Sequence, residues 1–173
     1  MGTLGAQPSA AGSASYVFNP ETDDACSGVN QRVAYMSAPL ENAIDLVGAA
    51  DLVMHVSIDT PDADIFAYLG VEVNGLDQVA SQLSRRLRFR DSMSAPTPVP
   101  TDQDLELHLS FKAVAFRLEK GARLFVTIKS TACGYAENPN TGGSMVDDTT
   151  TQPVTVTVLT GPDTPSRIEL PVL

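Results

Sequence analysis

Histidine and serine side chains are the first candidates for chemistry in this sequence. His55 and His108 are its only histidines, and histidine is the usual general base near neutral pH. Both lie on the polar face of alternating segments, a position typical of surface or interface residues. Ser13 and Ser144 each follow a glycine, but outside the strand-to-helix G-x-S-x-G context that exposes a hydrolase nucleophile. No serine–histidine–aspartate spacing is evident, so we predict no catalytic residue and no enzymatic activity of this chain alone.

Asp59, Asp62 and Asp64 are the candidates for a metal site, because three carboxylates in a short segment could bind a hard cation such as calcium. Their spacing lacks the central glycine and distal glutamate of an EF-hand. Aspartates in turns also hydrogen-bond to nearby backbone, which explains the cluster without a metal. The sequence has no glycine-rich phosphate-binding motif. We therefore predict no metal and no cofactor.

The charge balance argues against nucleic acid as a partner. Eleven basic and twenty-one acidic residues give a net charge of 11 − 21 = −10, which repels phosphate backbones. Arg85, Arg86, Arg88 and Arg90 form a local exception, which we interpret as a solvated or ion-paired face. No apolar run approaches the length that spans a bilayer, so we expect a soluble protein that does not enter membranes.

The two cysteines, Cys26 and Cys133, lie too far apart in sequence for a C-x-x-C motif. The alternatives are one long-range disulfide or two free thiols, of which free thiols are favoured. Residues 1–15 have neither the basic nor the apolar region of a signal peptide. The sequence therefore carries no recognised targeting signal, and the compartment stays open.

The elements that must position any site are strands. Leu52, Met54, Val56 and Ile58 alternate with polar or smaller residues, the period of a half-buried strand. Similar alternation recurs at residues 105–111, 124–128, 154–158 and 168–172, and less regularly at 33–37, 44–47, 65–73 and 83–90. Eight or nine strands without a long helix predict an all-β fold of two packed antiparallel sheets.

Residues 1–15 are small, nearly uncharged and without apolar periodicity, a composition typical of a flexible linker or tail. We therefore place a single domain at residues 16–173. Its length is that of one β-sandwich core.

Several short motifs occur in the order found in one known family. They are residues 35–40 (YMSAPL), 47–52 (VGAADL), 61–64 (PDAD), 86–92 (RLRFRDS), 116–121 with Arg123, 138–142 (NPNTG) and 165–172 (PSRIELPV). From about Tyr16 onward, the chain resembles the C-terminal domain of the cocaine esterase, α-amino-acid ester hydrolase and Xaa-Pro dipeptidyl-peptidase family. One departure is Ala122, which stands where the family commonly has the histidine of a glycine–histidine–arginine turn.

This resemblance implies a jelly-roll β-sandwich of the galactose-binding-domain-like kind. The parent enzymes are serine hydrolases whose triad lies in an α/β-hydrolase domain, and no position here corresponds to it. The resemblance implies a non-catalytic accessory role: shaping the cleft and the oligomer interface of an α/β-hydrolase domain, in cis or in trans, with homo-oligomers also possible. The motif residues that occupy turns and strand faces are Asp62, Asp64, Arg86, Arg88, Asn138 and Asn140.

The alternative function is a free-standing carbohydrate- or ligand-binding jelly-roll module. Its usual stacking platform is poor here, because the chain has no tryptophan, four tyrosines and six phenylalanines. For an accessory domain, aromatic, methionine and arginine residues are the expected contacts. The candidates are Phe89, Phe116, Arg86, Arg88, Tyr135 and Met145.

Overall fold

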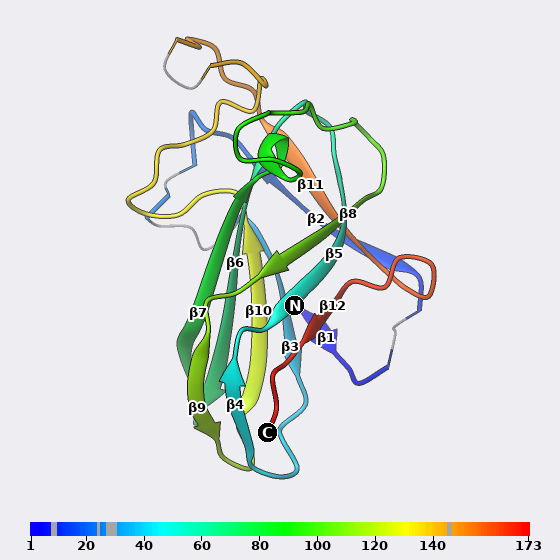
Figure 1. Ribbon diagram of the computed structural model, residues 1–173, viewed down its shortest axis with the longest axis vertical. Coiled ribbons are helices and arrows are strands. Elements are labelled where there is room, and N and C mark those ends of the chain that lie inside the picture. Colours follow the sequence, from blue (N-terminus) through cyan, green and yellow to red (C-terminus); the bar gives the residue numbers. More distant parts are fainter. Residues whose placement is uncertain (8–9, 24, 27–30, 145–146) are drawn as a thin grey trace.

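A computed structural model describes residues 1–7, 10–23, 25–26, 31–144 and 147–173. Two five-stranded sheets pack face to face around one core (Figure 1). The first sheet has the order β1-β3-β10-β6-β7, with all neighbours antiparallel except β1 and β3. Its strands are β1 (Gly2–Leu4), β3 (Arg32–Ser37), β10 (Arg123–Lys129), β6 (Asp64–Val73) and β7 (Leu76–Arg86).

The second sheet is built around β5 (Asp51–Ile58), which pairs with three other strands. They are β8 (Leu105–Ser110), β11 (Val154–Thr160) and β12 (Arg167–Glu169); β2 (Gly12–Phe18) pairs with β11. A separate pair, β4 (Ile44–Gly48) and β9 (Val114–Leu118), lies at the opposite end of the sandwich from the long loops (Figure 1). The all-β sandwich prediction is therefore confirmed, while the galactose-binding-like subclass stays a prediction.

The core forms because alternate residues of facing strands point inward. In β6, Ile65, Ala67 and Leu69 are buried in the core shared with the second sheet, including Val156 of β11. Phe66 is also buried but does not belong to this core, because it lies on the opposite, outer face of β6. The outer face of the first sheet therefore carries aromatic side chains of its own.

The turn between β6 and β7 follows from Asn74 and Gly75. Both have positive φ, 54° and 79°, as a two-residue hairpin with the right-handed strand twist requires. A strand predicted at residues 83–90 is shorter than expected, since β7 ends at Arg86 and a 3-10 helix, η1 (Leu87–Phe89), follows. The backbone N–H of Leu87 donates to the carbonyl oxygen of Ala63, and the side chain of Leu87 is fully buried.

The N-terminal segment differs from the flexible tail assigned to residues 1–15. Strand β1 pairs with β3 at residues 2–4, and Gly12 to Ser15 already pair with β11, so β2 begins before Tyr16. The physical reason is that edge pairing uses backbone groups, and small side chains do not prevent it. The Ser15 hydroxyl also hydrogen-bonds the Thr157 hydroxyl at 2.9 Å.

The cysteine alternative favoured from the sequence was wrong. Cys26 and Cys133 form a disulfide with a Cα–Cα distance of 4.5 Å. The fold brings together the loop after β2 and the loop after β10, which lie 107 residues apart in sequence. The described residues include no helix with the length and apolarity to span a membrane.

Candidate functional site

Asp64 and Arg86 form the centre of the candidate site, where β6 begins and β7 ends. The two residues lie directly opposite each other in the sheet register. Arg86 donates from Nε and Nη2 to the two carboxylate oxygens of Asp64, both at 2.7 Å. Burial lowers the pKa of Arg86, but the hydrogen bonds and charge of Asp64 outweigh it and the net shift is upward. The pair is therefore a bidentate, charged clamp between neighbouring strands.

Asp62 lies just before β6 and is fully buried. One carboxylate oxygen accepts a hydrogen bond from the backbone N–H of Arg88 at 3.0 Å, and Arg88 Nε lies 3.3 Å from the other as an ion pair. Burial raises the pKa of the Asp62 carboxyl, while hydrogen bonds from Arg88 and Asn138 and the charge of Arg88 oppose this shift. Asp62 therefore depends on its partners to stay ionised.

Asn138 joins the two ion pairs. Its Nδ2 donates to Asp62 at 3.1 Å and to Asp64 at 3.0 Å, while its Oδ1 accepts from the backbone N–H of Asn140 at 3.0 Å. Asn140 has a positive φ of 64° and exchanges hydrogen bonds with Gln152, side chain to backbone in both directions. The asparagines thereby fix the loop between β10 and β11 onto the first sheet.

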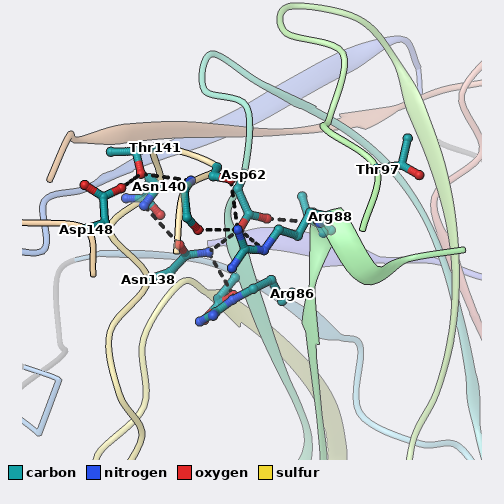
Figure 2. Close-up of polar contacts among 12 residues, drawn as sticks. Asp62, Arg86, Arg88, Thr97, Asn138, Asn140, Thr141 and Asp148 are labelled. Carbon is teal, nitrogen blue, oxygen red and sulfur yellow. Dashed lines mark hydrogen bonds and ion pairs between the residues drawn. The ribbon is translucent and has the colours of Figure 1, made fainter. Parts of the chain in front are cut away.

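Arg88 extends this network to the same loop. Its Nη1 donates to the carbonyl of Gly142 at 2.9 Å and also to that of Gly143. Figure 2 shows the side chains of Asp62, Arg86, Arg88, Asn138 and Asn140 converging from separate segments of the chain. The structure thus brings together all six residues singled out from the sequence motifs.

The chemistry of this network is that of a structural clamp. Two carboxylates and two guanidinium groups give a charge of 2 − 2 = 0, and each carboxylate is paired. In the described parts of the chain, no three His, Cys, Asp or Glu side chains are grouped so that they could hold a metal ion. Asp59, the third carboxylate of the candidate calcium cluster, accepts a hydrogen bond from the backbone of Thr155 instead.

The network also forms part of the wall of an open groove of about 390 Å³. Asp64 and Arg86 line it, together with Phe66, Phe89 and Tyr135. Its lining residues come from the start of β6, the end of β7, η1 and the residues after it, and the loop after β10, which lie at the end of the sandwich where the long loops gather (Figure 1). Tyr135 contacts Phe66 edge-to-face, with ring centroids 5.0 Å apart.

The histidines differ from one another. His108 is exposed beside Glu106, as predicted. His55 is buried, contrary to the expected surface position, and Asp104 from the loop before β8 lies 3.0 Å from its Nδ1. The backbone N–H of His55 donates to the Ser166 hydroxyl, which itself donates to Leu159. The described contacts of the His55 ring involve Asp104 and no serine.

The remaining sequence candidates have varied positions. Ser13 lies in β2 rather than in a linker, and the Ser144 hydroxyl donates to Asp147. Of the predicted interface residues, Phe116 packs against the core and Tyr135 is half exposed. Met145 lies outside the described residues.

Sequence reasoning missed Asp104 and Gln152. Asp104 hydrogen-bonds to His55, which lies 49 residues away in the sequence, and Gln152 and Asn140 each hydrogen-bond to the other's backbone. No short sequence motif around Asp104 or Gln152 indicates these contacts.

Comparison with known families decides the relationship. Residues 2–169 match the family described as the X-Pro dipeptidyl-peptidase C-terminal non-catalytic domain. The chain belongs to this family. No curated protein matches its sequence.

Solved structures show the same fold. They include an α-amino acid ester hydrolase (23% identity, TM-score 0.91) and an aminopeptidase from a marine sediment Thaumarchaeota archaeon (19%, 0.92). A CocE/NonD family hydrolase from Staphylococcus aureus is also similar (17%, TM-score 0.71). In each case 99% of this chain aligns, but it covers only 34–35% of the other chain. The chain thus spans about a third of the length of each of these relatives.

Proposed function

We propose that this domain is a non-catalytic accessory domain that packs on an α/β-hydrolase domain, in the same polypeptide or as a separate chain. There it shapes the substrate cleft and contributes to an oligomer interface. The observation that carries the proposal is the match of residues 2–169 to a family of non-catalytic domains. The relatives' names describe hydrolases and an aminopeptidase, and their chains are about three times as long as the aligned part.

The outer face of the first sheet is the proposed contact surface. Phe66 and Phe125 are buried there without belonging to the core, and Tyr135 covers Phe66 while remaining 51% exposed. Lys129 lies 5.1 Å from the ring centroid of Tyr68 on the same face. Aromatic side chains are enriched at the centres of protein interfaces, which favours docking through this face rather than through the second sheet.

A binding experiment tests the docking proposal. The chain is mixed with a separately produced α/β-hydrolase domain from the same source, and the affinity is measured by sedimentation velocity. Tyr135→Asp places a charge on the proposed contact surface and should weaken binding at least about tenfold. The matched control is Val17→Asp, which alters a residue of similar exposure (49%) on β2 of the other sheet and should bind normally.

Two results would contradict docking through this face. One is the absence of a complex at high concentration, and the other is a loss of binding caused by Val17→Asp but not by Tyr135→Asp. The chain alone is expected to show no turnover of aryl esters or dipeptide p-nitroanilides above background, because the described hydrogen bonds of the His55 ring reach Asp104 and no serine, threonine or cysteine. Turnover that Ser144→Ala abolishes would overturn this expectation.

The second candidate function is the free-standing ligand-binding module, which the groove beside Tyr135 favours. A glycan array separates it from the accessory role, because specific sugar binding by the isolated chain is expected only for the module.

A further inference from the structure

The groove at the loop end of the sandwich has the dimensions of a small-ligand site. Its volume of about 390 Å³ falls within the range of pockets that hold small molecules. It lies between the end of β7, the residues that follow it, and the loop after β10 that carries Tyr135. Asp64 at the start of β6 holds Arg86 at the end of β7 and accepts a hydrogen bond from Asn138 in the loop after β10, so the groove is largely pre-formed.

The walls of the groove are mainly apolar. The apolar side chains that line it are those of Phe66, Phe89, Met93 and Tyr135. Phe66 and Tyr135 already pack edge-to-face, and the guanidinium of Arg88, the residue before Phe89 in η1, lies 5.4 Å from the centroid of the Phe89 ring. Such walls offer apolar and aromatic contacts to a flat group of about the size of a phenyl ring.

One cation in the groove has no counterion among the residues that the structure describes. Arg86 is neutralised by Asp64, whereas Arg85 forms no ion pair with any carboxylate among the described residues. Among the described residues, the buried Nε of Arg85 has no hydrogen-bond acceptor. The Nη1 of Arg85 donates only to the sulfur of Met93, at 2.9 Å. The lining charges sum to 2 − 1 = +1 in a chain whose net charge is −10.

A carboxylate is the complement of such a guanidinium. Arginine presents donors in a planar fork that can bind both oxygens of a carboxylate, and thioether sulfur is a weak acceptor that a carboxylate would readily displace. Ser84 also lines the groove, and its exposed hydroxyl makes no hydrogen bond with any described residue. It lies on the Phe66 side of β7, whereas the side chain of Arg85 leaves the strand on the opposite face, so the two are separate groups of the groove wall.

We propose that this groove binds a small carboxylate that bears an aromatic or other flat apolar group. The carboxylate binds Arg85, and the apolar group lies among Phe66, Phe89 and Tyr135. This proposal is a property of the domain by itself and does not depend on its docking to a hydrolase domain.

Isothermal titration calorimetry on the full chain tests the proposal with 3-phenylpropionate as the probe. The neutral isostere 3-phenylpropanamide should bind at least about tenfold more weakly, because it lacks the charge that Arg85 recognises. Arg85→Gln should weaken 3-phenylpropionate binding by a similar factor. The control Arg117→Gln removes an exposed guanidinium that already pairs with Asp45 on the far pair of strands, and it should leave the affinity unchanged.

A second variant guards against misfolding of the first. Tyr135→Ala removes a half-exposed ring that lines the groove and should weaken binding by a smaller factor, while the unfolding transition stays that of the parent. The proposal is overturned if 3-phenylpropionate does not bind, if the amide binds equally well, or if Arg117→Gln weakens binding as much as Arg85→Gln.

Discussion

Removal of the disulfide is expected to be the most destabilising change in this domain. Cys26 and Cys133 close a loop of 107 residues, and such a cross-link restricts the unfolded chain. The loop-closure relation gives a loss of about 16 cal/mol/K for this length, or about 5 kcal/mol at 25 °C. The double variant Cys26→Ser/Cys133→Ser should lose this free energy of unfolding, with a fall in Tm of about 10–20 °C for a domain of this size.

The measurement is urea unfolding followed by far-ultraviolet circular dichroism and tyrosine fluorescence, since the chain has no tryptophan. The parent chain with reductant should match the double variant, and reductant should not change the double variant. A double variant that unfolds within about 1 kcal/mol of the oxidised parent would refute the reasoning, because the closed loop would then have contributed little.

Two further stability measurements use matched pairs of variants. Asp64→Ala leaves the largely buried Arg86 without its carboxylate and should cost about 3 kcal/mol in urea unfolding, whereas Asp45→Ala breaks only an exposed pair and should change little; equal effects would contradict the role of burial. Gly75→Ala should cost about 1 kcal/mol, because Gly75 has a φ of 79° in the hairpin turn. Gly5→Ala, which meets only ordinary contacts, should be neutral, and an equal loss in both variants would argue against backbone strain as the cause.

The sequence predicted most strands, because apolar and polar residues alternate along a strand that has one face in the core and the other in solvent. It failed at residues 12–15, where small side chains carry no alternation and pairing with β11 depends on backbone groups. It also named the Cys26–Cys133 disulfide only as the less favoured of two alternatives. Sequence spacing says nothing of two loops that meet only when β10 enters the first sheet beside β3.

The site was predictable in its membership but not in its arrangement. Motif order singled out Asp62, Asp64 and Asn138, yet the contact between Asp62 and Asn138 joins residues 76 apart in the sequence. His55 illustrates the same limit. Its place on a polar strand face indicates exposure, whereas the folded chain buries it, with its Nδ1 3.0 Å from Asp104, a residue 49 positions away.

The four arginines at residues 85–90 show how burial divides roles among similar side chains. Arg86 and Arg88 pair with carboxylates and Arg90 donates to backbone carbonyls, so most of their hydrogen-bonding capacity serves the fold. A charge that is already neutralised inside the protein attracts a ligand only weakly, because the ligand must compete with an existing partner. Arg85 has no such partner among the described residues and lies in a groove with apolar walls. Recognition of a carboxylate is therefore expected at Arg85, while its three neighbours hold the groove in shape.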